Sequence, residues 1–133
     1  MIAKSILLAE DDEDDRLFFR DFLKDREDVR LLSPVENGIE LLNTLSIAKE
    51  KNVLPDLIIL DQNMPKLNGV QTLQRIRQDK DYDDIPVFVY STYTTDELVK
   101  NCMSIGATLV LSKPADKTGY STMIDAFFEA AGI

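Results

Sequence analysis

Residues 55–65 read Pro-Asp-Leu-Ile-Ile-Leu-Asp-Gln-Asn-Met-Pro, and they are the most informative segment about the fold. Its apolar run, residues 57–60, is too short for a helix and is bounded by turn-forming residues, a pattern typical of a buried strand. A strand that is apolar on both faces fits a parallel sheet covered by helices on either side. The run ends in Asp61-Gln62-Asn63, so it places an acidic side chain at the carboxyl end of the strand.

Further apolar runs of the same kind lie before and after this one. They are Ser5–Ala9, Val29–Leu32, Val87–Tyr90 and Leu109–Leu111. Apolar residues also recur at helical spacing between and after the runs, around residues 18–23, 41–45, 70–76, 98–103 and 120–128. This strict alternation of strand and helix, with right-handed crossovers, predicts a doubly wound α/β domain in which helices cover both faces of a parallel sheet.

The fourth predicted helix carries local signals at both ends. Thr94 with Glu97 matches a capping box at its start, and Gly106 is a typical helix stop. The sequence contains no linker or internal repeat. With 133 residues, 44% of them hydrophobic, we expect residues 1–133 to form a single domain.

The chain is strongly acidic. Its 24 Asp and Glu residues outnumber its 15 Lys and Arg residues and give a net charge of -9. This charge repels nucleic acid and anionic membrane surfaces, so we expect no direct binding to nucleic acid. The apolar run near the N-terminus, Ile6–Ala9, is too short for a signal peptide or a membrane span. We therefore expect a cytoplasmic protein without membrane insertion.

Polar side chains follow four of the predicted strands. The ends read Glu10-Asp11-Asp12, Asp61-Gln62-Asn63, Ser91-Thr92 and Lys113-Pro114. A single acid after a strand is more often a helix start or a turn residue. In doubly wound sheets, however, the functional crevice lies beyond the carboxyl ends of the strands. Four polar ends together therefore favour one shared site.

If Glu10, Asp11 and Asp61 lie together, their carboxylates repel one another and need a cation. The sequence has no histidine and only Cys102 as a thiol, which excludes imidazole and thiolate metal sites, disulfides and His-dependent triads. Mg²⁺ fits the remaining oxygen ligands best, and no EF-hand-like loop favours Ca²⁺. Lys113 and Ser91 are suited to the oxygens of a bound phosphoryl group, so the parts match phosphoryl transfer.

These residues, in this order, resemble the receiver domain of bacterial response regulators, the family of the chemotaxis regulator CheY. The resemblance covers nearly the whole chain. It is carried by the segments Ile6–Asp12, Pro55–Pro65 with Asn68-Gly69, Pro86–Thr92, and Gly106-Ala107 leading to Ser112-Lys113-Pro114. It implies a flavodoxin-like or CheY-like sheet with five strands in the order 2-1-3-4-5 and five helices.

The resemblance also implies roles for the residues at the strand ends. Asp61 would be the phospho-acceptor, and Mg²⁺ would be held by Glu10, Asp11, Asp61 and the backbone carbonyl of Asn63. Ser91 matches the switch hydroxyl. Lys113 matches the family's lysine, whose bond to Pro114 the family holds cis.

One departure from the family pattern concerns the aromatic switch. Val110 stands three residues before Lys113, where many relatives carry a Tyr or Phe. Tyr90 or Tyr93 is a candidate substitute, although tyrosines near strand ends usually serve packing. Tyr93 lies two residues after Ser91, at a position that influences water access to the acyl phosphate. If Tyr93 shields the acyl phosphate, we expect slow self-dephosphorylation.

The resemblance favours a stand-alone phospho-accepting signalling receiver that is not an enzyme, although it assists its own phosphorylation and dephosphorylation. The phosphodonor would be a histidine kinase, a phosphotransfer protein or a small phosphodonor, and the output would be altered binding to a downstream protein. The protein would be a monomer or a phosphorylation-dependent dimer. Two alternatives stay open: an unphosphorylated receiver-like adaptor, and a Mg²⁺-dependent phosphohydrolase of the haloacid-dehalogenase type. The latter places its nucleophile in an Asp-x-Asp after the first strand, which here ends in Glu10-Asp11-Asp12.

Overall fold

Strands and helices alternate along the chain in the computed structural model, which describes residues 2–133. The strands are β1 (Lys4–Ala9), β2 (Val29–Leu31), β3 (Leu57–Asp61), β4 (Val87–Ser91) and β5 (Leu109–Ser112). The helices are α1 (Glu13–Leu23), α2 (Gly38–Glu50), α3 (Gly69–Arg77), α4 (Asp96–Ile105) and α5 (Lys117–Ala131), with a short 3₁₀ helix over Lys80–Tyr82. The elements occur in the order that the sequence predicts.

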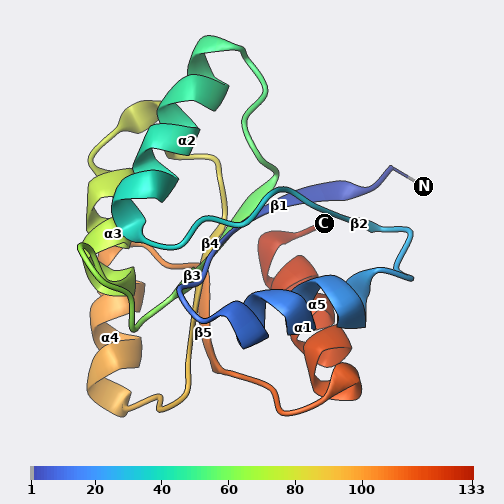
Figure 1. Cartoon of the computed structure of the whole chain (residues 1–133). Helices are drawn as coiled ribbons and strands as arrows, with labels where there is room; N and C mark the ends of the chain where they lie inside the picture. Colours follow the sequence, from blue (N-terminus) through green and yellow to red (C-terminus); the bar gives the residue numbers. More distant parts are fainter. Residues whose placement is uncertain (1) are drawn as a thin grey trace.

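The five strands form one parallel sheet in the order β2-β1-β3-β4-β5, which confirms the predicted topology. Helices α1 and α5 cover one face of the sheet, and α2, α3 and α4 cover the other (Figure 1). Every residue of β3 and β4 is buried, as expected for strands with helices on both sides. After β2 the chain crosses back over β1 and forms β3 on the other side of it, so the strand order reverses between β1 and β3.

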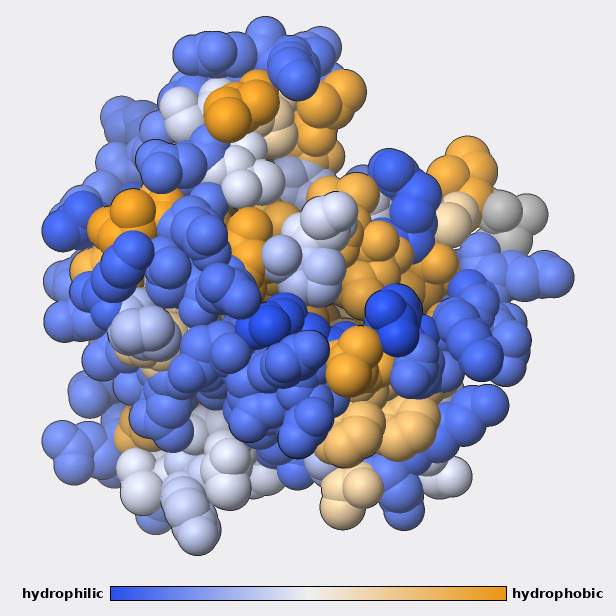
Figure 2. All heavy atoms as spheres, in the orientation of Figure 1, coloured by the Kyte–Doolittle hydropathy of each residue, from blue (hydrophilic) through white to orange (hydrophobic). Residues whose placement is uncertain are grey.

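Each face of the sheet has its own core. Under α2, α3 and α4 the buried side chains are mostly aliphatic. Under α1 and α5 they include an aromatic group made of Phe19, Phe88, Tyr90, Tyr120 and Phe127. Hydrophilic residues cover most of the surface seen in Figure 2, and apolar residues show through near β1 and β2. The aromatic group lies against the strands whose ends form the site described below.

The predicted start of α4 is wrong by one residue. Thr95, not Thr94, caps the helix, and its hydroxyl accepts a hydrogen bond from the Leu98 backbone N–H at 3.1 Å. Because the helix begins at Asp96, Glu97 does not stand at the position that a capping box needs. Thr94 instead shares a 2.8 Å hydrogen bond with the Ser112 hydroxyl at the end of β5.

The predicted end of α4 is confirmed. Gly106 follows the helix with a φ of 124°, a conformation that other residues rarely adopt, and its N–H donates to the Cys102 carbonyl.

Within residues 2–133, no helix has the length and apolar character needed to cross a membrane.

Candidate functional site

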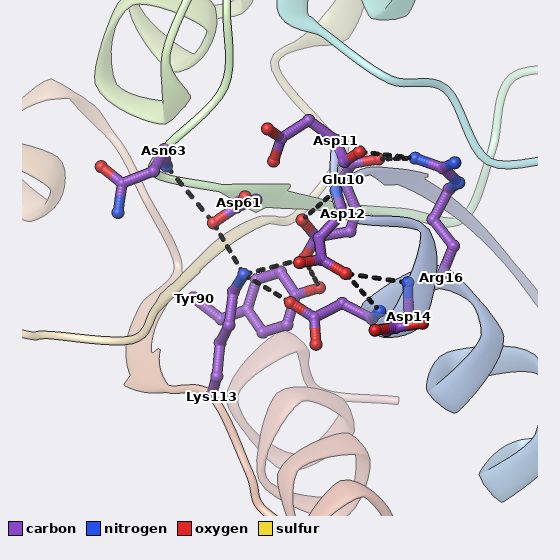
Figure 3. Close-up of polar contacts among 10 residues, drawn as sticks. Glu10, Asp11, Asp12, Asp14, Arg16, Asp61, Asn63, Tyr90 and Lys113 are labelled. Atoms are coloured by element: carbon purple, nitrogen blue, oxygen red, sulfur yellow. Dashed lines mark hydrogen bonds and ion pairs between the residues drawn. The ribbon is translucent and has the colours of Figure 1, made fainter.

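Three strand ends meet at the carboxyl edge of the sheet, as the sequence predicts (Figure 3). The Lys113 ammonium, which follows β5, lies 3.0 Å from Glu10 Oε1 and 3.2 Å from Asp61 Oδ1. Glu10 follows β1, and Asp61 is the last residue of β3. Both carboxylates are almost fully buried, at 0% and 1% exposed. Residues more than 50 positions apart in the sequence therefore form one polar cluster.

Asp61 is a strand residue and does not lie in the following loop. The ladder between β3 and β4 continues to the pair Asp61 and Tyr90, so β3 extends one residue beyond its predicted end at Leu60. The Asn63 backbone N–H donates to Asp61 Oδ1 at 3.3 Å. The strand backbone and this turn thus hold the carboxylate at the bottom of the site.

Asp15 is a member of the cluster that sequence reasoning missed. Its Oδ2 lies 2.9 Å from Lys113 Nζ. Asp12 caps α1, because its side chain accepts hydrogen bonds from the N–H groups of Asp14 and Asp15. Asp15 therefore lies in the first turn of the helix, close to the strand ends. Assigning Asp12 as the helix cap from the sequence would have placed Asp15 in the first turn, near the strand ends, and so would have indicated its contact with Lys113.

The cluster holds more negative than positive charge. Lys113 pairs with Glu10, Asp15 and Asp61, and no other cation pairs with these carboxylates among residues 2–133. Burial and the neighbouring Glu10 carboxylate raise the pKa of Asp61 to about 8, although Lys113 acts in the opposite direction. Burial would lower the pKa of Lys113, but the carboxylates of Asp15, Glu10 and Asp61 raise it above its usual value. The lysine is therefore charged, and the ionised form of Asp61 is disfavoured until another cation binds.

The carboxylates fit a divalent cation. One oxygen each of Glu10, Asp11 and Asp61 can lie within 4.8 Å of the others, and Asp11 is exposed to solvent. Asp11 and Asp61 line an open hollow of about 560 Å³, together with Asn63, Thr92 and Lys113. An all-oxygen donor set with access to water is the environment that Mg²⁺ prefers. The metal role predicted for the Asn63 carbonyl stays a prediction, whereas the Asn63 N–H donates to Asp61 Oδ1.

Ser91 lies at the end of β4, and its side chain is 2% exposed. Within residues 2–133 its hydroxyl makes no hydrogen bond to the site carboxylates, whereas its backbone carbonyl accepts from the Lys113 N–H at 2.9 Å. The neighbouring Thr92 lines the hollow. The structure thus places Ser91 beside the site without joining its hydroxyl to the carboxylates.

Tyr90 belongs to the site through its phenol. The hydroxyl donates a hydrogen bond to Glu10 Oε1, and Lys113 Nζ lies 5.0 Å from the ring centroid. Burial and the Glu10 carboxylate raise the pKa of Tyr90 well above its usual value, so the phenol is protonated and acts as the donor. Tyr93, by contrast, is 82% exposed, and its proposed shielding of an acyl phosphate stays a prediction.

The expected cis bond before Pro114 is wrong. No peptide bond is cis among residues 2–133, so Lys113–Pro114 is trans, the isomer that most X-Pro bonds adopt. The Lys113 ammonium nonetheless lies 3.2 Å from Asp61 Oδ1. The ammonium can reach Asp61 because β5 ends beside β4 and because the lysine side chain is four carbons long.

Comparison with known proteins agrees with this geometry. The family model for the response regulator receiver domain matches residues 6–125. The chain is 26% identical to the phosphorylated cyanobacterial phytochrome response regulator RcpA, with a TM-score of 0.82, covering 96% of this chain and 92% of that one. It is 29% identical to the Mn²⁺-bound form of the response regulator Rcp1, with a TM-score of 0.74, covering 98% of this chain and 91% of that one.

Curated relatives include longer proteins. The chain is 30% identical over 122 residues to a protein-glutamate methylesterase/protein-glutamine glutaminase of Clostridium acetobutylicum, covering 90% of this chain and 33% of that protein. It is 34% identical over 108 residues to a protein of the same description from Methanospirillum hungatei, covering 76% of this chain and 29% of that protein. The chain thus spans about a third of the length of these relatives. On its fold and on the family match, it belongs to the response regulator receiver domains of two-component signal transduction.

Proposed function

We propose that Asp61 accepts a phosphoryl group from the phosphohistidine of a histidine kinase or phosphotransfer protein. The observation that carries this proposal is the buried Asp61 carboxylate, 3.2 Å from the Lys113 ammonium and open to an acidic hollow. A carboxylate oxygen of Asp61 forms the new bond to phosphorus while the P–N bond to the donor imidazole breaks. The donor histidine keeps the electron pair of that bond and takes up a proton, and Asp61 becomes an acyl phosphate.

Mg²⁺ fits this reaction, and Glu10, Asp11, Asp61 and the Asn63 carbonyl are the residues that would hold it. When bound, the ion neutralises negative charge on the carboxylates and on the incoming phosphoryl oxygens. Two relationships support the assignment: three carboxylate oxygens can lie within 4.8 Å of one another, and the Mn²⁺-bound Rcp1 is 29% identical to this chain.

Lys113 has the charge and the reach to neutralise an oxygen of the transferred phosphoryl group. In this proposal its ammonium leaves Asp61 Oδ1 for that oxygen, and Ser91 donates its hydroxyl to another. Both residues are joined through the Lys113 N–H and the Ser91 carbonyl, 2.9 Å apart. The resulting shift at the end of β4 and the start of α4 changes the surface that a downstream protein binds.

The remaining parts of the proposal concern the whole protein. Residues 1–133 act as one receiver domain, consistent with the family match over residues 6–125. The domain passes a signal on by binding and turns over no substrate of its own. A cytoplasmic location and a monomer or phosphorylation-dependent dimer stay predictions from the sequence.

The test is phosphorylation by acetyl phosphate with Mg²⁺, followed by intact mass spectrometry. We expect one added phosphoryl group, which hydroxylamine removes because it is an acyl phosphate, and no adduct on Asp61→Asn. Asp56→Asn is a matched control, since Asp56 lies at the opposite end of β3 and accepts hydrogen bonds from Ser5. No adduct from acetyl phosphate or from a phosphorylated kinase would favour the unphosphorylated adaptor. Multiple turnover of small phosphate esters would favour the phosphohydrolase.

A further inference from the structure

Tyr90 contacts residues from all three strands that carry the site. Its phenol donates to Glu10 Oε1 after β1, and its ring lies 5.0 Å from Lys113 Nζ after β5. Its backbone carbonyl accepts from the Gln62 N–H, which directly follows the end of β3, at 3.1 Å. Tyr90 also precedes Ser91 in β4. Tyr90 thus contacts the residue that follows each of β1, β3 and β5, and Figure 3 shows its ring beside Glu10 and Lys113.

The ring of Tyr90 is fixed from below by the aromatic core. The residue is 0% exposed, and Phe19 packs against it edge to face with a centroid distance of 5.5 Å and an interplanar angle of 82°. A tyrosine side chain has only two main torsions, and close packing leaves them little freedom. The phenol oxygen is therefore a rigid donor aimed at Glu10.

Glu10 needs such a donor. It is 0% exposed, its Oε2 accepts from the Asp12 N–H at 3.1 Å, and its Oε1 is shared by Tyr90 and Lys113. A buried carboxylate that loses a partner carries a large desolvation cost. Glutamate also has one more side-chain torsion than aspartate, so a ligand oxygen at this position is held in place only if another group restricts it.

We propose that Tyr90 is a positioning residue of the metal site, whose phenol fixes the Glu10 carboxylate in the orientation that binds Mg²⁺. This inference rests on the proposed function, because that function places Mg²⁺ at Glu10 and draws Lys113 toward a phosphoryl oxygen. When the ammonium turns to the phosphoryl group, Tyr90 remains the donor on Glu10 Oε1. Partners that orient a metal ligand in this way typically change metal affinity 10- to 100-fold.

The test compares Mn²⁺ binding by the wild-type protein and Tyr90→Phe, measured from the electron paramagnetic resonance signal of free Mn²⁺ and by competition with Mg²⁺. The variant removes one oxygen and keeps the ring against Phe19. We expect its dissociation constant to rise about 10-fold, the lower end of the range for such partners, because Asp12 N–H and Lys113 still hold Glu10. Thermal unfolding with a chelator present verifies that both proteins are folded at the temperature of the titration.

Tyr120→Phe is the matched control. Tyr120 is 1% exposed and belongs to the same aromatic group, where it packs against Phe19 at 5.1 Å, but within residues 2–133 its hydroxyl makes no hydrogen bond to Glu10. We expect its Mn²⁺ affinity to equal that of the wild type. A second arm repeats Tyr90→Phe in a Glu10→Ala background, where we expect no additional loss because the phenol acts through Glu10.

The outcomes separate the inference from the proposed function. If the wild type binds Mn²⁺ and Tyr90→Phe binds it within twofold, the inference is wrong and the proposed function stands. An equal loss in Tyr120→Phe, or an undiminished loss in the Glu10→Ala background, also overturns the inference. If the wild type binds neither Mn²⁺ nor Mg²⁺, the metal part of the proposed function fails together with it.

Discussion

Two partly buried cations, Arg26 and Lys113, are each surrounded by acidic residues at opposite ends of the sheet. Arg26 precedes β2 and pairs with Asp28 and Asp125, at 2.6 and 2.8 Å. Lys113 follows β5 and pairs with Glu10, Asp15 and Asp61. Their side chains are similarly buried, at 18% and 14% exposed. Composition alone does not distinguish the two clusters.

They differ in how completely the charges are satisfied. Arg26 binds both oxygens of Asp28, and its remaining N–H groups reach the Ser121 carbonyl and hydroxyl at 3.0 Å. Its acidic partners remain partly exposed, at 25% and 67%. At Lys113 one ammonium serves three carboxylates, two of them buried. At Arg26 the excess negative charge lies on partly exposed acids that water can solvate, and the cluster stabilises the fold. At Lys113 the excess negative charge is buried, which prepares the cluster for a further cation and a phosphoryl group.

The largest effect should come from removing the cation of the Lys113 cluster. Lys113→Gln should slow phosphorylation by acetyl phosphate about 10²- to 10³-fold, the usual cost of losing one electrostatic stabiliser of a transition state. Time-resolved intact mass spectrometry with saturating Mg²⁺ measures the rate. Lys117→Gln, which changes an exposed lysine 3.6 Å from Asp25, is the control and should react at the wild-type rate. Equal rates for Lys113→Gln and the wild type would remove the distinction between the clusters.

Removing the cation of the Arg26 cluster should affect folding instead. Arg26→Met should lower the free energy of unfolding by about 2 kcal/mol, between the values for buried and exposed ion pairs. Arg26 lowers the pKa of Asp28, so this stabilisation is present above pH 4 and is lost as the pH falls through the folded-state pKa of Asp28. Urea denaturation at several pH values measures both effects. A loss of Mg²⁺ affinity in the folded variant would contradict the assignment of Arg26 to structure.

Neutralising Asp61 should stabilise the protein when no metal is bound. Well below pH 4 the Asp61 carboxyl is protonated in both folded and unfolded states, so Asp61→Asn should match the wild type. Because the folded-state pKa is raised to about 8, the wild type loses stability as the pH rises toward 8, and the variant does not.

We expect Asp61→Asn to be more stable at pH 8 by at least about 1 kcal/mol, or at least roughly 3 °C in Tm. Differential scanning calorimetry with a chelator measures this difference. Saturating Mg²⁺ should reverse the order, because the ion stabilises the wild type by binding its folded state. A wild type that is the more stable protein in chelator at pH 8 would count against excess charge at the site.

The smallest effect should come from the partly exposed acid of the Lys113 cluster. Asp15→Asn removes one of the partners that compete with a phosphoryl oxygen for the ammonium, and it lowers the negative charge facing an anionic donor. We expect phosphorylation by acetyl phosphate to become two- to threefold faster, in line with the small energies of exposed ion pairs. Asp14→Asn, a neighbouring exposed acid, is the control. A slower reaction in Asp15→Asn would show that Asp15 holds Lys113 in its working position.

The sequence predicts the fold and most of the site because both depend on local patterns. Short apolar runs locate the strands, and parallel winding brings their carboxyl ends to one edge, which is enough to bring Glu10, Asp61 and Lys113 together. The correct end of α4 follows similarly from Gly106, since few other residues adopt its φ of 124°.

What the sequence misses depends on side-chain geometry across the fold. The pairing of Asp15 with Lys113 requires knowing that α1 begins at Glu13, and the contact of Tyr90 with Glu10 requires the side-chain direction in β4. Neighbouring threonines offer equivalent capping signals, so only the packed structure selects Thr95 over Thr94. The isomer of the bond before Pro114 likewise has no local pattern that fixes it.

The hydrogen bond between Thr94 and Ser112 ties the segment after β4 to the last residue of β5. Ser91 precedes Thr94 in the same segment, and Lys113 directly follows Ser112. The Lys113 backbone N–H also donates to the Ser91 carbonyl. Two hydrogen bonds therefore connect the β4–α4 segment to the end of β5. Neither that segment nor the backbone of Lys113 can move far without straining or breaking one of them. Motion at this corner of the molecule is therefore shared between both segments from its first step.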